Sequence, residues 1–368
     1  ANPLVENIVI IGGDGVVPMA GIPDLTTIAN EASFAPELVT PNNDGSFSSN
    51  ELSAALGAGL LLSDDPYGVV RDPADNSCEG CITVGDHELF APVLNLGRLV
   101  EGASEIVGSL DHFVEYEGRL DPDTLASGVV SGYDFLTDGA EDVKAALEGD
   151  GLAVNTALPP GTDELIGDDW DRDDLLAGFA SAGVDVVSAN AHYDHETLLP
   201  ALQNALGTWD QIDLVSVGDL AAIPADAASD TLNNPARAVV GITMGCHAGL
   251  SVDDVQLGFA ATDWAETYSG ANNVLLAQTT YGYGDSDIVA LSERLLAITA
   301  GNLAEMSVGE AVRFAKAEYL ATTLVLNPYD EKILQAFTNY GLPMYEMGGS
   351  AAAAAASESA VGAGSDGA

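Results

Sequence analysis

The sequence predicts an α/β fold with a mostly parallel central sheet, and three observations support this. Short apolar runs bounded by turn residues alternate along the chain with segments of helical periodicity. The runs are apolar throughout, which is typical of strands that helices cover on both faces. The chain has 368 residues, of which 47% are hydrophobic, and this is enough to bury a large core.

The patterns place the elements as follows. The expected strands are residues 7–11, 93–100, 127–133, 152–156, 184–190, 238–246 and 273–280. The expected helices are residues 102–117, 138–148, 171–182, 255–269, 285–300, 308–320 and 330–339. Residues 12–92 are rich in Pro, Gly, Asp and Asn and have weak periodicity, so we expect loops to dominate there.

The glycines in Gly12-Gly13-Asp14-Gly15 follow the first expected strand. A dinucleotide-binding loop needs a third glycine and a helix that opens directly behind it, whereas here Pro18 and another loop follow. We therefore expect a tight turn at these glycines.

A change of pattern near residues 120–123 divides the chain into two lobes. Residues 1–120 are expected to form a smaller α/β lobe, and residues 121–347 a larger lobe. Residues 348–368 consist mainly of Ala, Gly and Ser, which predicts a flexible tail or linker, with a short helix over 351–356 as the alternative.

The charge balance is strongly acidic. Ten basic residues against 57 acidic ones give a net charge of −47. Because the chain is also hydrophobic enough to fold, the acids must coat a folded surface, and a surface of this kind is suited to molar salt, as in a halophile. The same charge argues against nucleic acid or an anionic membrane as a partner. No apolar stretch approaches the ~18 to 20 residues that span a bilayer, so membrane insertion is not expected.

The chain has three cysteines: Cys78 and Cys81 lie close together in the sequence, and Cys246 lies far from both. Cys78 and Cys81 are compatible with a small disulfide, a redox pair or half of a zinc site. Zinc needs four ligands and the chain has no second pair, so a loop disulfide or two inert thiols is favoured. Cys246 is then a free thiol.

Cys246 and His192 end two of the expected strands, and together they can carry nucleophilic catalysis. In an open α/β sheet, functional groups gather at the carboxyl ends of the strands. A thiol attacks as thiolate, and a nearby imidazole can accept its proton and deliver it to the leaving amine. His247 is adjacent to Cys246, but neighbouring strand residues point to opposite faces, so His192 is the favoured partner. The alternative is a buried, inert cysteine beside an ordinary strand-end histidine.

These residues resemble the caspase-like cysteine peptidases, and the surrounding phrases look most like the gingipain branch. The strand ending in His192 precedes, by one crossover, the strand ending in Cys246. The other phrases are Val9-Ile10-Ile11-Gly12-Gly13-Asp14, Leu96-Gly97-Arg98-Leu99-Val100, Gly132-Tyr133-Asp134-Phe135 and Gly341-Leu342-Pro343-Met344-Tyr345. The resemblance covers about residues 4–345.

The resemblance implies a caspase-like α/β/α sandwich in which Cys246 attacks a peptide carbonyl and His192 protonates the departing amine. In the family, a glycine after the histidine lends its backbone N–H to the oxyanion hole. Tyr193 stands at that place here, and its N–H is expected to serve the same purpose. The alternative is a catalytically silent caspase-like domain that acts as a surface or scaffold module.

The resemblance also suggests a polypeptide substrate that is cut after Arg or Lys. Asp134 is the candidate acid for the specificity pocket, with Asp138 as a competitor. Tyr283 is a candidate for lining the cleft; the alternative is a glycine turn capped by Asp285 or Ser286. Relatives are often secreted or bound to the cell surface, so an extracellular or surface location is favoured over a cytoplasmic one.

No cofactor is required for this chemistry, and no metal is assigned. Relatives often carry structural calcium, and the acid pairs Asp168-Asp169 and Asp253-Asp254 are the places where it would bind. A solvated acidic surface is the favoured interpretation of both pairs.

Overall fold

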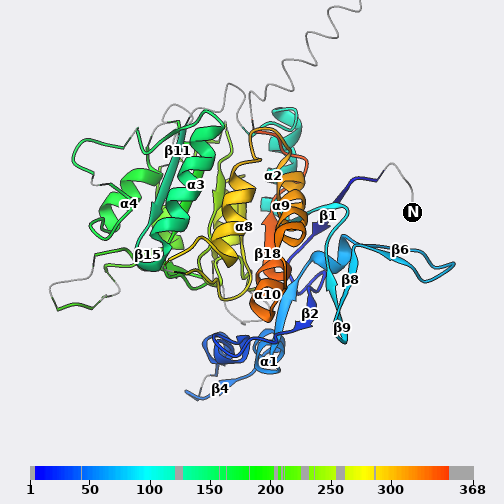
Figure 1. The fold of residues 1–368 in the computed structure, drawn as a ribbon. Coiled ribbons are helices and arrows are strands. Elements are labelled where there is room, and N and C mark those ends of the chain that lie inside the picture. Colours follow the sequence, from blue (N-terminus) through cyan, green and yellow to red (C-terminus); the bar gives the residue numbers. More distant parts are fainter. Residues whose placement is uncertain are drawn as a thin grey trace, which may run out of the picture.

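The computed structural model contains one eight-stranded sheet (Figure 1). It describes residues 5–42, 44–120, 127–156, 158–162, 164–181, 183–202, 206–208, 210, 212–224, 232–235, 237–253, 262–285 and 287–347. The strands are, in spatial order, β1 (Asn7–Ile11), β10 (Asn95–Leu99), β18 (Phe337–Tyr340), β17 (Val274–Gln278), β16 (Val240–Ile242), β13 (Val186–Asn190), β11 (Ser127–Gly132) and β12 (Ala153–Val154).

The sheet is mostly parallel, as predicted. Only β17 and β18 pair in antiparallel fashion among the neighbours of this sheet. The strands from β17 to β12 therefore run in one direction, and β18, β10 and β1 run in the other. The carboxyl ends of β11, β13, β16 and β17 consequently lie at one edge of the sheet.

Helices cover both faces of the sheet and enclose two cores. One face carries α3 (Thr137–Gly149), α8 (Leu291–Ala300), α9 (Val308–Thr322) and α10 (Pro328–Ala336). The other face carries α4 (Arg172–Phe179), α5 (Val217–Ala221) and α7 (Trp264–Gly270), while α2 (Ala103–Glu115) packs against α7. Successive strand residues divide between the cores: Val129 joins one and Val130 the other.

The structure confirms the seven expected strands and corrects the bounds of two helices. The expected helix over 330–339 is wrong at its end, because α10 stops at Ala336 and β18 begins at Phe337. All four residues of β18 are buried between β10 and β17, so they lack the alternation that marks a half-buried strand. The expected helix over 285–300 begins later, at Leu291. Most of the expected helix over 255–269 lies outside the described residues, and α7 covers its end.

The region from residue 12 to residue 92 has more regular structure than expected. It contains α1 (Glu51–Gly57) and 3-10 helices at Glu31–Ser33, Ala35–Leu38 and Asp65–Tyr67. It also contains the pairs β2 (Ala20–Pro23) with β5 (Leu60–Ser63), β3 (Thr40–Pro41) with β4 (Phe47–Ser48), β6 (Val70–Arg71) with β7 (Cys78–Glu79), and β8 (Cys81–Val84) with β9 (His87–Phe90). These strands are too short to give a sequence period, which explains why the pattern predicted loops. Figure 1 shows β2, β4 and α1 at the end of the sheet where α10 lies.

The turn expected after the first strand is present. Gly12 has a φ of 113°, and the Val16 N–H donates to the Gly13 carbonyl at 3.0 Å. A helix does not open behind these glycines, so the dinucleotide-loop alternative is excluded at this position.

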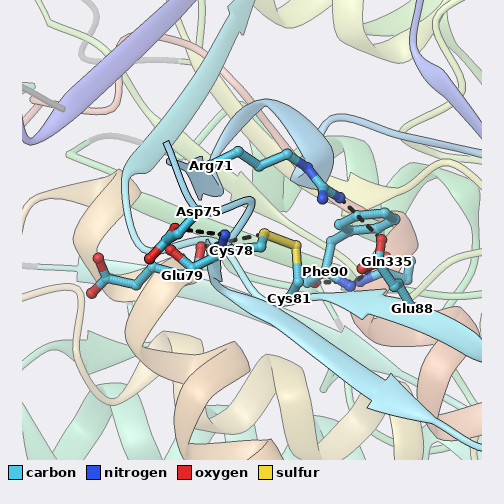
Figure 2. Close-up of a disulfide and its surroundings, with 9 residues drawn as sticks. Arg71, Asp75, Cys78, Glu79, Cys81, Glu88, Phe90 and Gln335 are labelled. Atoms are coloured by element: carbon cyan, nitrogen blue, oxygen red, sulfur yellow. Dashed lines mark hydrogen bonds and ion pairs between the residues drawn. A yellow bond between two sulfur atoms is a disulfide. The ribbon is translucent and has the colours of Figure 1, made fainter. Parts of the chain in front are cut away.

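Cys78 and Cys81 form a disulfide between β7 and β8 (Figure 2). Beside it, Arg71 and Glu88 form an ion pair at 3.0 Å. The bond sits in the small hairpins and away from the central sheet.

Residues on either side of the proposed lobe boundary share the central sheet, since β1 and β10 extend the strands of the larger lobe. Residues 121–126, which follow Leu120 at the expected boundary, and residues 348–368 lie outside the described residues. Within the described part of the chain, no helix has the length and apolar character needed to cross a bilayer.

Candidate active site

The edge formed by the carboxyl ends of four adjacent strands brings the predicted site residues together. β17, β16, β13 and β11 are neighbours in that order. Tyr283, Cys246, His192 and Asp134 follow these four strands in the same order. Crossovers therefore bring together four residues that lie far apart in the sequence.

His192 and Cys246 occupy equivalent positions beyond two paired strands. Ser188 of β13 is the register partner of Ile242 of β16. His192 follows Ser188 by 192 − 188 = 4 residues, and Cys246 follows Ile242 by 246 − 242 = 4 residues. A methyl group added to Gly245 would overlap the ring of Tyr193, so the segments that carry the two residues are in contact. The structure thus places His192 and Cys246 at adjacent strand ends, on segments that touch.

Buried polar side chains hold the two strand ends. The Asn190 amide donates to the Ser131 carbonyl at 3.0 Å, and its oxygen accepts from the Met244 N–H at 3.3 Å. The Thr243 hydroxyl donates to the Ala189 carbonyl at 2.6 Å and accepts from the Gly245 N–H at 3.0 Å. These contacts tie β11, β13 and β16 together directly below the site.

The His192 imidazole is held by three consecutive residues that follow β11. Its ring meets the rings of Tyr133 and Phe135 edge to face, with centroids 5.8 Å and 5.5 Å apart. The Asp134 carboxylate lies between these aromatic residues in the sequence, and its Oδ2 is 3.8 Å from Nε2 of His192. The His192 side chain is 39% exposed and the Asp134 side chain 64%, so both are open to a substrate.

The Cys246 thiol is half-buried and lies against the next strand end. Its Sγ is 3.8 Å from the Gly282 carbonyl oxygen. Burial raises the pKa of the thiol above its ordinary value, and the negative charge of Glu31 acts in the same direction. The thiol is therefore protonated at neutral pH in the resting protein, and attack requires transfer of its proton to a base.

Tyr193 packs its ring against Gly245 and lies 5.3 Å from the Trp264 ring, measured between centroids. Burial raises the pKa of its hydroxyl well above the ordinary value. The Leu199 N–H donates to the His192 carbonyl, and the Asp194 N–H donates to the Thr197 carbonyl, each at 2.9 Å. Tyr193 is thus the non-hydrogen-bonded member of this antiparallel bridge, and its N–H points away from Leu198.

His247, the neighbour of Cys246 in the sequence, is engaged with other residues. It is fully buried, and its Nε2 lies 2.9 Å from Oε2 of Glu31. Its ring stacks on Phe34 with centroids 3.5 Å apart. Sequence reasoning missed this pairing, because Glu31 lies in the region that was expected to be loops.

Tyr283 reaches the site's edge but binds the N-terminal segment. Its hydroxyl donates to the carbonyls of Ile28 and Ala29 at 2.9 Å and 3.0 Å. Its backbone exchanges hydrogen bonds with Ser292. A role for Tyr283 in binding substrate stays a prediction.

The remaining candidate acids lie near the same edge. The Asp285 carboxylate accepts from the N–H groups of Asp287 and Ile288, which makes it part of a turn and not the cap of α8. Asp138 is in the first turn of α3, and Asp168 accepts from the Asp134 N–H at 3.0 Å. Ser286 and Asp254 lie outside the described residues. In the described part of the chain, His, Cys, Asp and Glu side chains form no cluster of three or more with metal-binding geometry.

Two parallel halves joined at one antiparallel pair, with helices on both faces, define a caspase-like α/β fold. No protein-family model and no curated protein matches the sequence.

Solved structures do match. The crystal structure of gingipain R (RgpB), described as an Arg-specific cysteine proteinase, aligns with a TM-score of 0.52 and 12% identity, and the match covers 93% of this chain and 64% of that one. The complex of the pro- and mature domains of RgpB from Porphyromonas gingivalis aligns with a TM-score of 0.53 and 11% identity, over 94% of this chain and 66% of that one. This chain is thus similar in fold to structures that are considerably longer.

Proposed function

We propose that this chain is a cysteine endopeptidase in which Cys246 is the nucleophile and His192 the general base and acid. The thiol proton moves to His192 as Sγ bonds to the carbonyl carbon of the scissile peptide. His192 then protonates the leaving amine as the C–N bond breaks, and water hydrolyses the resulting thioester. The observation that carries the proposal is the equivalent register of His192 and Cys246 beyond β13 and β16.

Two neighbours support this chemistry. The Asp134 carboxylate is near enough to stabilise the imidazolium that forms when His192 takes the thiol proton. The backbone N–H groups of Tyr193 and Cys246 are the proposed donors to the oxyanion. The reaction needs a thiolate and an imidazole and no metal.

The proposed substrate is a polypeptide cut after Arg or Lys, in high salt. The edge carries several carboxylates. Asp134 is 3.8 Å from His192, and Asp168 accepts from the Asp134 N–H. Asp138 and Asp285 lie near Glu293, and among the described residues no basic side chain forms an ion pair with either of them. Such a region favours a cationic side chain. The net charge of −47 supports a working environment of molar salt, where surface repulsion is screened.

An extracellular or cell-surface location is part of the proposal. The Cys78–Cys81 disulfide supports it, because such bonds persist in oxidising compartments.

The test is alkylation of Cys246 by iodoacetamide in molar salt. Activity is measured during labelling as the cleavage of peptides that release a dye after Arg or Lys. We expect one label per chain, at Cys246, and loss of cleavage in proportion to labelling. The alternative function is a catalytically silent scaffold, and it predicts no cleavage before labelling. Redox chemistry at Cys78–Cys81 predicts activity that survives labelling of Cys246.

A further inference from the structure

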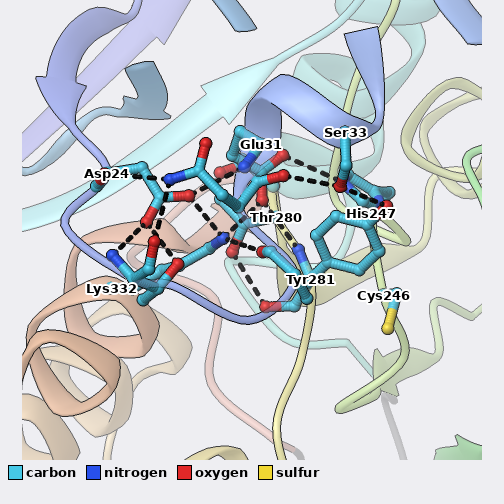
Figure 3. A network of polar contacts seen from close by, with 12 residues as sticks. Asp24, Glu31, Ser33, Cys246, His247, Thr280, Tyr281 and Lys332 are labelled. Atoms are coloured by element: carbon cyan, nitrogen blue, oxygen red, sulfur yellow. Dashed lines mark hydrogen bonds and ion pairs between the residues drawn. The ribbon is translucent and has the colours of Figure 1, made fainter. Parts of the chain in front are cut away.

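A buried network of four ionisable side chains lies directly behind Cys246 (Figure 3). Glu31 is fully buried; its Oε2 is 2.9 Å from Nε2 of His247, and its Oε1 is 2.7 Å from Nζ of Lys332. Lys332 also contacts Oδ2 of Asp24 at 2.8 Å. The network joins the N-terminal segment to α10 and to the chain that follows Cys246.

Glu31 fixes the backbone on one side of the thiol through His247. His247 follows Cys246 and has a φ of 56°, a left-handed conformation that is uncommon for a residue with a side chain. Its N–H donates to the Thr280 carbonyl at 2.7 Å, and its ring is clamped between Glu31 and Phe34. A backbone conformation of this kind persists where the surrounding contacts impose it.

The same carboxylate fixes the strand end that faces the thiol. Oε1 of Glu31 accepts the Tyr281 N–H at 3.1 Å. The next residue is Gly282, whose carbonyl oxygen lies 3.8 Å from Sγ of Cys246. A methyl group added to Gly282 would overlap the Met244 carbonyl oxygen, so the two strand ends already touch. One carboxylate therefore holds both segments between which the thiol sits.

We propose that Glu31 is a positioning residue for Cys246, so that the N-terminal segment completes the site on the larger lobe. The expected effect on catalysis rests on the proposed function, whereas the expected effect on the position of the Cys246 thiol does not. Among the described residues, Glu31 forms no hydrogen bond or ion pair with Cys246 or His192; it acts through His247 and Tyr281.

The test compares Glu31→Gln with the wild type by two readouts, peptide hydrolysis and the rate of Cys246 alkylation as a function of pH. If the Cys246 thiol is no longer held in place, kcat should fall by roughly 10- to 100-fold, with KM nearly unchanged. Alkylation by the small reagent iodoacetamide should become about three- to tenfold faster at pH 8, because a loosened thiol is less buried and no longer faces the charge of Glu31. The alkylation profile should shift to lower pH. General destabilisation would also slow hydrolysis and speed alkylation, so both rates are measured where the variant is fully folded and are compared with those of a matched control.

Asp185→Asn is the matched control. Asp185 is a buried carboxylate that pairs with Arg237 just before β13, so it precedes the strand whose far end carries His192. We expect this variant to lower the melting temperature and to leave both rates unchanged per folded molecule. His247→Asn is a second variant in case Glu31→Gln does not fold, because Asn tolerates a left-handed backbone and lacks the ring that reaches Glu31. It should change both rates in the same directions as Glu31→Gln.

Wild-type rates and an unshifted alkylation profile in folded Glu31→Gln would overturn the inference. If the wild type cleaves no peptide while Glu31→Gln still alkylates faster, the proposed function fails and the positioning role stands. If the wild type cleaves peptides and Asp185→Asn changes both rates as Glu31→Gln does, the effect is general destabilisation and the inference fails.

Discussion

Nε2 of His192 lies 3.8 Å from Oδ2 of Asp134, the residue that the sequence suggested as the acid of a specificity pocket. A carboxylate here has two possible roles, and they differ in kinetics. If Asp134 orients His192 and stabilises its charged form, Asp134→Asn should lower kcat by roughly 10- to 100-fold and leave KM within about threefold. We expect this result, and steady-state kinetics on Arg- and Lys-ended peptides will check it.

Asp138→Asn is the control for this prediction, because Asp138 belongs to α3 and is the competing candidate for the pocket acid. We expect this variant to keep the wild-type kcat. The pocket role for Asp134 predicts instead that KM for basic substrates rises while peptides with a neutral residue before the cut are unaffected. That outcome would contradict the orienting role.

Tyr193→Phe tests whether Tyr193 acts through its backbone N–H. The variant keeps the ring that packs on Gly245 and Trp264 and removes only the buried hydroxyl. We expect a stability loss of about 1 kcal/mol, the usual cost of one hydrogen bond. The value of kcat/KM should stay within about twofold, because the oxyanion donor is the N–H. A loss of more than about tenfold with normal folding would assign a catalytic role to the hydroxyl.

Glu293 should make stability depend on pH. It is buried in the first turn of α8, near Asp138 and Asp285, and its Oε1 has no hydrogen-bond partner among the described residues. Burial raises its pKa from 4.5 to about 7. The folded protein therefore binds this proton more tightly than the unfolded chain, and the stability contributed below about pH 4.5 is lost as pH rises through 7.

Glu293→Gln removes the charge and keeps an oxygen for the N–H groups of Asp285 and Ala290. Relative to the wild type, the variant should gain about 1 to 2 kcal/mol at pH 8, after allowance for solvent screening, and almost nothing at pH 4. Thermal unfolding in molar salt at the two pH values measures this difference. Equal effects at pH 4 and pH 8 would show that the carboxyl group titrates normally.

The central sheet could be predicted from the sequence because its strands are continuous apolar runs between turn signals. Val186–Asn190 is buried at every position, and such a run is distinct from its polar flanks. The strand Phe337–Tyr340 was not predicted. It is buried at every position and follows α10 without a turn signal, so periodicity could not separate the strand from the helix.

The proximity of the His192 and Cys246 strand ends could be predicted from the sequence, because both residues end predicted strands and strand ends converge at one edge of the sheet. The Glu31 network could not be predicted from the sequence, because its members come from a 3-10 helix, a strand end and α10. Buried charges leave no period in a sequence. The only signal available was the scarcity of lysine: Lys332 is one of three, and both Lys332 and Lys316 are buried in ion pairs.

The acidic surface predicts that folding depends on salt. With a net charge of −47, repulsion among surface carboxylates grows as the screening length rises from about 3 Å at 1 M to about 30 Å at 0.01 M salt. We expect the helical circular-dichroism signal to fall as NaCl is lowered from molar to millimolar. An unchanged signal over this range would contradict the prediction, and sucrose at matched osmolarity is the control for non-ionic effects.

Cleavage of a peptide library in molar salt by the wild type and by Cys246→Ala tests the central claim most directly. Replacing the CH2SH side chain with a methyl group removes the nucleophile and changes the half-buried site by the loss of one sulfur atom. We predict cleavage by the wild type after Arg or Lys and a fall of at least about 1,000-fold in Cys246→Ala, with an unchanged melting curve. Equal cleavage by the two proteins, or none by the wild type under conditions where it alkylates and folds, would contradict the assignment of Cys246 as a catalytic thiol.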